Sequence, residues 1–176
     1  MRQLAKTVLA GAVLSVLAAC GYHLVGTGAG SLPPNLVKLY VAPLVNQTGR
    51  PELDQRLSEE LSQEWLRRGR FRLVGSAEEA DAVLSGTLVA VSVMPVQFDA
   101  QGRATQYQLL IVADMKLVDR TGDKPKELWH EPRLSRTVTY DVDASAANYF
   151  DRELEAIERL SREFARAVVV SVLEGF

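Results

Sequence analysis

Two histidines and one cysteine are the side chains of this 176-residue chain best suited to acid–base, nucleophilic or metal chemistry. Nucleophilic catalysis needs an activated Ser, Cys or Lys beside a base, and a zinc site needs several His, Cys, Asp or Glu ligands. His23 lies beside a glycine-rich stretch and His130 lies within a predicted strand, and neither has partners at such spacing. His130-Glu131 also lacks the second histidine of the zinc-protease motif. We therefore expect no catalytic residue, no metal and no cofactor, and we predict that the chain is not an enzyme.

Cys20 follows the features of an export signal. Arg2 and Lys6 give a positive start, and residues 8–17 are apolar or small apart from Ser15. This run is too short to span a bilayer, which takes about 20 apolar residues, but it is typical of a secretory signal peptide. The string Leu17-Ala18-Ala19-Cys20 resembles the bacterial lipobox, in which the cysteine is acylated and becomes the new N-terminus. We expect residues 1–19 to be the signal peptide and Cys20 to be the lipidated residue.

The sequence after Cys20 divides into a tether and one domain. Residues 26–30 are rich in glycine, but no strand precedes them and they lead into Pro33-Pro34, so a phosphate-binding loop is not indicated. We interpret residues 20–34 as a lipidated tether. Residues 35–176 are long enough for a single domain with its own core. Gly21, rather than aspartate, follows the cysteine, which favours the outer membrane over the inner membrane, with the domain in the periplasm.

The first half of this domain has a strand–helix–strand pattern. Apolar alternation predicts a strand over residues 37–41, and leucines and a tryptophan at every fourth position from Leu53 predict a helix that stops at Gly69. A short strand over residues 71–74 follows. A right-handed crossover would place the two strands parallel within one sheet.

The second half reads as long antiparallel strands and a final helix. We predict strands over 83–96, 107–117 and 128–142, bent or ended at Pro95 and broken at Pro132, with turns at 99–103 and 121–123. A helical stripe follows, capped by Asp143 or Ser145 and running to about Leu173. Its solvent side is expected to carry the acidic and basic residues Glu153, Glu155, Glu158, Arg159, Arg162 and Arg166, and its apolar stripe to include Tyr149, Phe150, Leu154, Ile157, Leu160, Phe164 and Val168. The predicted fold is α+β, a two-layer sandwich with a mixed β-sheet and two α-helices on one face.

The overall charge argues against one class of partner. The chain carries 20 basic and 22 acidic residues, for a net charge of −2, and no polybasic run. Nucleic acid is therefore not an expected partner.

Two short motifs resemble one protein family. Cys20-Gly21-Tyr22-His23-Leu24 is similar to the mature start of the LptE-type lipopolysaccharide-assembly lipoproteins, and residues 102–109, GRATQYQL, resemble their central hairpin. The order of the predicted elements is also similar over nearly the whole mature chain. The resemblance implies a plug-and-barrel complex with the outer-membrane β-barrel LptD, and assistance in placing lipopolysaccharide in the outer leaflet. It also implies binding of lipopolysaccharide by basic residues near one end of the sheet.

A second reading stays open at this point. Asn46-Gln47-Thr48 after the first strand also resembles lipoproteins that activate peptidoglycan synthases or form curli-type secretion channels. The Cys-Gly-Tyr-His-Leu start and the Gln-Tyr-Gln strand argue against this alternative.

Three arginines are the candidate lipopolysaccharide-binding residues. A guanidinium suits phosphate, and turns and strand ends are more accessible than helix stripes. Arg103 lies in the predicted hairpin, and Arg133 and Arg136 follow the break at Pro132. They would form one basic patch only if the hairpin and the last strand meet at the same end of the sheet. Because Arg133 and Arg136 are an odd number of residues apart, a regular strand would point them to opposite faces.

Overall fold

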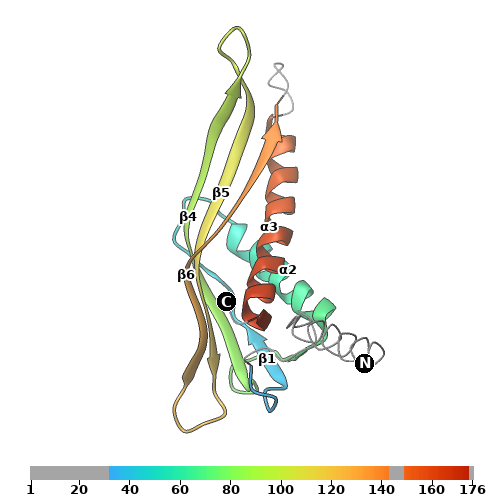
Figure 1. Ribbon diagram of the computed structural model, residues 1–176, viewed down its shortest axis with the longest axis vertical. Helices are drawn as coiled ribbons and strands as arrows, with labels where there is room; N and C mark the ends of the chain where they lie inside the picture. The colour runs from blue at the N-terminus through green and yellow to red at the C-terminus, as the bar shows by residue number, and fades with distance from the viewer. Residues whose placement is uncertain (1–31, 143–148, 175–176) are drawn as a thin grey trace, which may run out of the picture.

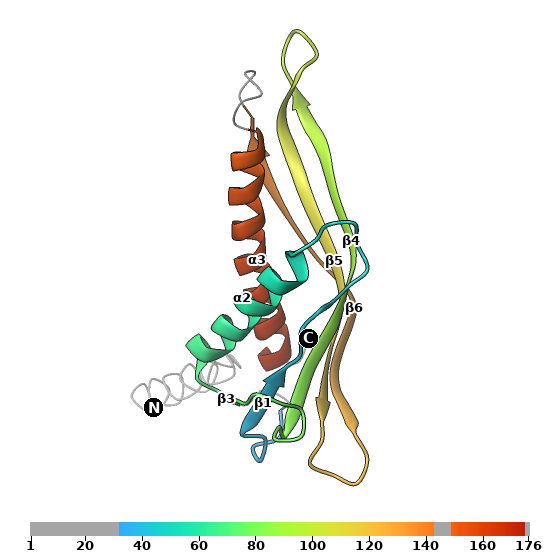
Figure 2. The same cartoon turned by 180° about the vertical axis from the view of Figure 1, so that it is seen from behind.

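A mixed six-stranded sheet carries two helices on one of its faces in the computed structural model, which describes residues 32–142 and 149–174 (Figure 1). The elements, in chain order, are β1 Lys38–Val41, β2 Val45–Asn46, α2 Leu53–Arg68, β3 Arg72–Leu73, β4 Ala82–Phe98, β5 Ala104–Asp119, β6 Lys126–Asp141 and α3 Tyr149–Glu174. Both helices lie on the same side of the sheet when the molecule is turned around (Figure 2). The predicted α+β two-layer fold is confirmed.

The strand order is β3-β1-β4-β5-β6, with β2 pairing separately with β4. β1 is parallel to β3, because the chain leaves β1, crosses over through α2 and returns as β3 in the same direction. On its other side β1 is parallel to β4. The predicted strand–helix–strand crossover is thus confirmed. β2 was not predicted, since its two residues are too few to show a pattern.

The long meander β4-β5-β6 forms because its strands are consecutive and joined by tight turns. Alternate residues of β5 face the helices and are buried: Leu109, Ile111, Ala113, Met115 and Leu117. This is the face that the period-two pattern predicted. Gly102 adopts a φ of 77° in the β4–β5 turn, a conformation that glycine accepts without steric cost.

Two β-bulges flank Ala113, one on each side of β5. In β4 the register shifts between Leu88 and Ala90, and in β6 it shifts between Glu131 and Leu134, around Pro132. The predicted break at Pro132 is therefore a bulge. A further shift follows Pro95, so β4 is irregular there but continues to Phe98. Bulges bend a strand and increase its twist, which fits the strong curvature of the three long strands in Figure 1.

α2 buries the face that its four-residue spacing predicted. Leu53, Leu57, Leu61 and Trp65 are all buried against the sheet and α3. The helix ends at Gly69, which has a φ of 64° and donates its N–H to the Trp65 carbonyl.

α3 buries a stripe that differs from the predicted one in its first turns. Phe150 and Leu154 were expected on the buried side, but they are 80% and 48% exposed. Glu153 was expected in solvent, but it is buried and forms an ion pair with Arg50. From Ala156 onward the helix follows the expected stripe, with Leu160, Phe164 and Val168 buried. The prediction was wrong in the first turns because a long-range partner, which local spacing does not show, offsets the cost of burying Glu153.

Several predictions fall outside the described residues. These are the signal segment, Cys20, most of the tether and the capping of α3 by Asp143 or Ser145. No helix in the described part of the chain is long and apolar enough to cross a membrane.

Candidate functional site

The β4–β5 hairpin presents Arg103 at one end of the long sheet. The Asp99 carboxylate accepts hydrogen bonds from the backbone N–H groups of Gln101 and Arg103, and from Arg103 Nε at 2.8 Å. The backbone bond from Arg103 is the main reason that the pKa of Asp99 lies below its ordinary value, with the guanidinium adding to the effect. The Arg103 side chain remains 57% exposed, so its outer N–H groups can reach an anion in solvent.

Arg133 and Arg136 lie well away from that hairpin. Arg136 is opposite Ile111 of β5, seven residues beyond Ala104. At about 3.3 Å per residue, that separation is roughly 23 Å along the strand. Arg133 is farther still, within the bulge before Leu134. The structure does not gather the three arginines into one patch.

The two β6 arginines also have different surroundings. Arg136 lies on the same, helix-facing side of β6 as the buried Leu134. Its Nη1 donates to the Ser135 carbonyl at 2.6 Å. Arg133 is exposed and has no hydrogen-bond or ion-pair partner among residues 32–142 and 149–174. Of the two, Arg133 is the more available for an external anion.

A polar cavity of about 250 Å³ lies between the end of β6 and the first half of α3. Arg152 and Arg159 line it from the helix, together with Glu155, and Thr139 to Asp141 line it from the strand. Arg159 Nη2 donates to the Thr139 carbonyl at 2.8 Å, and Arg152 pairs with Glu155 at 3.2 Å. Sequence reasoning did not select Arg152 or Arg159, because it ranked helix arginines as solvent-facing. Their spacing of seven residues, two helical turns, was the available signal that they share one side of α3.

A mostly apolar groove of about 270 Å³ lies on the helix side of the sheet, where the chain enters α2. Val91 and Leu109 line it from the sheet, and Leu154 and Ile157 line it from α3. Arg50 and Arg56 also line it, but each is paired with an acid of α3, Arg50 with Glu153 and Arg56 with Glu158 at 3.5 Å. The groove therefore offers apolar surface beside largely compensated charge.

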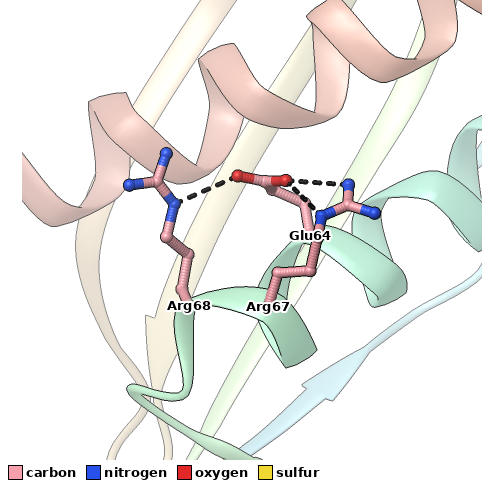
Figure 3. Close-up of polar contacts among 3 residues, drawn as sticks. All are labelled: Glu64, Arg67 and Arg68. Atoms are coloured by element: carbon pink, nitrogen blue, oxygen red, sulfur yellow. Dashed lines mark hydrogen bonds and ion pairs between the residues drawn. The ribbon is translucent and has the colours of Figure 1, made fainter.

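The buried carboxylate of α2 is held within its own helix. Glu64 accepts from Arg67 Nη2 at 2.8 Å and from Arg68 Nε at 3.0 Å, one arginine on each oxygen (Figure 3). Burial is the largest influence on Glu64 and would raise its pKa, but the hydrogen bonds and charges of the two arginines together outweigh it and leave the pKa below the ordinary value. All partners belong to one helix end, so this cluster is structural.

The remaining candidate for chemistry is His130, on the face of the sheet away from the helices. Its Nε2 lies 2.8 Å from Asp114 Oδ1 and its Nδ1 lies 3.8 Å from Glu127 Oε1. In the described part of the chain, no hydroxyl or thiol bonds to this imidazole, so the His–Asp pair has no nucleophile to activate. The exposed arginines and the apolar groove together offer surface for anions and for apolar groups.

Comparison with solved structures shows the same fold in bacterial proteins of low identity. A hypothetical protein, CT253 from Chlamydia trachomatis, matches with a TM-score of 0.54 and 12% identity, covering 80% of this chain and 99% of that one. Lipoprotein B from Nitrosomonas europaea, described as uncharacterized, matches with a TM-score of 0.53 and 18% identity, covering 86% and 90%. A putative lipoprotein from Caulobacter crescentus matches with a TM-score of 0.52 and 18% identity, covering 77% and 87%. A search of curated proteins gave no match.

A family model gives a more specific match. The model described as LptE, lipopolysaccharide-assembly, matches residues 36–171. This range runs from the residues before β1 into the last turns of α3, and it includes the β4–β5 hairpin and both cavities.

Proposed function

Because the chain belongs to the LptE family of lipopolysaccharide-assembly proteins, we propose that it is an outer-membrane lipoprotein that plugs an LptD-type β-barrel and promotes the assembly of lipopolysaccharide at the cell surface. The observation that carries this proposal is the family match over residues 36–171, which is most of the domain. The fold and the absence of an activated nucleophile among the described residues agree with a binding role. We propose that the protein is not an enzyme.

The proposed anchor is a lipid on Cys20. The motif Leu17-Ala18-Ala19-Cys20 supports removal of residues 1–19 and acylation of the cysteine, with residues 20–34 as tether and 35–176 as the periplasmic domain. Several acyl chains would hold the protein on the membrane durably, since one chain alone binds reversibly. Mass spectrometry of the protein from membranes should show a lipid-modified peptide that begins at residue 20. An unmodified peptide with a free thiol would contradict the anchor.

The barrel partner is tested by capture and by depletion. Extraction in mild detergent should recover a large outer-membrane β-barrel with this protein. Depletion should lower the amount of correctly assembled barrel and leave the outer leaflet poor in lipopolysaccharide. Recovery of a cell-wall synthase with altered crosslinking, or of a ring of this chain alone, would favour the activator or secretion alternatives.

Lipopolysaccharide binding is proposed to use arginines, with Arg103 as the first residue to test. Arg103 is exposed at the hairpin end, and Arg103→Glu would place a second acid beside Asp99, so an anionic ligand would be repelled. We expect this variant to bind purified lipopolysaccharide more weakly while it folds and captures the barrel normally. Arg120→Glu is the matched control, because Arg120 is an exposed arginine in the other hairpin, with one hydrogen bond to Ala77.

Arg133 and Arg136 are tested separately, since they do not share a patch with Arg103. Arg133→Glu is expected to weaken binding more than Arg136→Glu, because only Arg133 lacks a partner among the described residues. Unchanged binding in all three variants would remove these arginines from the proposed site, while leaving the barrel role to its own test.

A further inference from the structure

The outer half of β4 forms a free edge of the sheet. β1 and β2 pair with β4 only as far as Leu88. Beyond that point, no strand in the described part of the chain lies beside β4 on that side, and both views show it as the border of the sheet (Figures 1 and 2). Its pairing with β5 is regular from Ala90 to Pro95, between the two register shifts. Residues 90–95 therefore form an open edge.

The opposite border of the sheet carries charges that the open edge lacks. β6 carries Lys126, Glu127, Glu131, Arg133 and Arg136. On that border the Thr139 carbonyl already accepts a hydrogen bond from Arg159. β4 has no charged residue from Ala82 to Phe98, and its side chains Val89, Met94, Val96 and Phe98 are each at least 44% exposed. Proteins normally place charge on an uncovered edge to prevent pairing, so an uncharged, apolar edge indicates one that pairs.

The backbone groups of the open edge can be assigned from the alternation of the strand. The carbonyls of Leu84 and Leu88 accept bonds from Ala42 and Gln47, and both leucines face the helices. In one strand, residues that face the same side of the sheet direct their backbone groups to the same neighbour. Beyond the bulge the helix-facing residues are Val91 and Val93, opposite Ile111 and Leu109. Their N–H and C=O groups are therefore directed to the open side.

We propose that the open edge accepts an extended, uncharged segment of the barrel partner as an additional β-strand. This inference rests on the proposed function for the identity of the partner. Main-chain hydrogen bonds to Val91 and Val93 supply affinity, and the exposed apolar side chains of β4 favour apolar side chains on the added strand. A second copy of this chain fits less well. In a symmetric pair Pro95 of both copies would remove ladder donors, whereas a different segment needs to accommodate Pro95 only once.

Hydrogen exchange tests the proposal directly. Exchange is measured by mass spectrometry on the complex with the barrel and on the full chain alone, with peptides that cover residues 89–98. We expect amide exchange in this segment to slow at least about tenfold in the complex, as the free donors become bonded. Peptides from β6 are the internal control and should change less. A complex that forms without protection of residues 89–98 overturns the proposal and leaves the barrel role intact.

A matched pair of lysine variants gives an independent test. Ser92 and Thr137 lie in one row across the sheet, on either side of Leu110, so they are on the same face at opposite borders. Ser92→Lys is expected to weaken capture of the barrel by about tenfold, whereas Thr137→Lys should leave it unchanged. Equal effects of the two variants would overturn the proposal. Protection of residues 89–98 in the chain alone, rising with concentration and with a dimeric mass, would overturn it in favour of self-association.

Discussion

Gly86 is a residue whose lack of a side chain has a direct steric reason. It lies opposite Met115 in the β4–β5 ladder, and Met115 is fully buried. A Cβ added at Gly86 would overlap the Met115 sulfur and come within 2.8 Å of the Asp114 carbonyl oxygen. The close approach of β4 to the Met115 side chain therefore depends on glycine.

We predict that Gly86→Ala lowers the free energy of unfolding by about 1–3 kcal/mol, the usual cost of overpacking a core. Urea unfolding followed by circular dichroism measures it. Gly75→Ala is the control, because an added Cβ there has no neighbour within 4 Å, and its effect should stay within about 0.5 kcal/mol. Equal stability of Gly86→Ala and the wild type would show that Met115 has room to move.

The Glu64 carboxylate predicts a pH-dependent contribution to stability. Its pKa in the folded chain is lower than its ordinary value of 4.5, since the two arginines outweigh burial. Its contribution is therefore fully present above pH 4.5, and it is lost as the pH falls below 4.5 through the folded pKa. Glu64→Gln should lower the free energy of unfolding by about 1 kcal/mol at pH 7, a modest value because both arginines are partly exposed. The gap between variant and wild type should narrow at pH 3.

Glu59→Gln provides the comparison on the same helix. Glu59 is exposed, and its hydrogen bond comes from Gln55 at 3.0 Å rather than from an arginine. Its replacement should change unfolding little at either pH. A Glu64→Gln variant whose deficit grows on acidification would contradict the stated direction of the pKa shift.

At the scale of elements, the loop before α2 is fastened to the first turns of α3. Asn46 organises this loop, because its Nδ2 donates to the Arg50 carbonyl at 2.8 Å and to Asp54 Oδ1 at 2.9 Å. The loop thereby carries Arg50 to Glu153, 103 residues away in sequence. This ion pair therefore joins the loop before α2 to the first turns of α3, two segments far apart in the sequence.

We predict that Glu153→Ala loosens the beginning of α3. Removing the buried acid leaves Arg50 without this partner and exposes a helix start that already presents Phe150 to solvent. Amide exchange over residues 150–160 should accelerate, with a global loss of about 1–3 kcal/mol. Glu155→Ala is the control, since its pair with Arg152 is exposed and contributes little. If both variants exchange alike, the Arg50–Glu153 contact does not hold the helix.

The long elements could be predicted from the sequence because each one repeats its pattern many times. The alternation over β5, the four-residue spacing over α2 and the turn residues at 99–103 each fix an element locally. The strand order could not be derived, because the pairing of β1 with both β3 and β4 depends on contacts between distant segments. For the same reason, the prediction of which side is buried was wrong in the first turns of α3.

For the candidate site, the sequence was less informative than for the fold. Arg103 was placed correctly in a hairpin, but its distance from Arg133 and Arg136 depends on the length and register of β5. Arg159 bonds to Thr139, and Arg152 lines the same cavity, only because α3 packs on β6. A site assembled from separate elements needs the packing of those elements, which one sequence does not display.

At the scale of the whole molecule, the sheet combines two kinds of pairing. β4, β5 and β6 follow one another through short turns, whereas β1 reaches β4 by pairing Leu39 with Ala82. Closing a longer segment of chain costs more conformational entropy before any contact compensates for it.

This difference in pairing has a consequence for the order of events in folding. The meander should form first and present β4 as a template on which β1 docks late, followed by the crossover through α2. We predict high φ-values for a substitution such as Ile111→Val in β5 and low ones for Leu39→Ala in β1, measured by stopped-flow kinetics in urea. The β1 variant should mainly accelerate unfolding, and the β5 variant should mainly slow refolding. The reverse pattern would mean that the parallel centre of the sheet nucleates the chain.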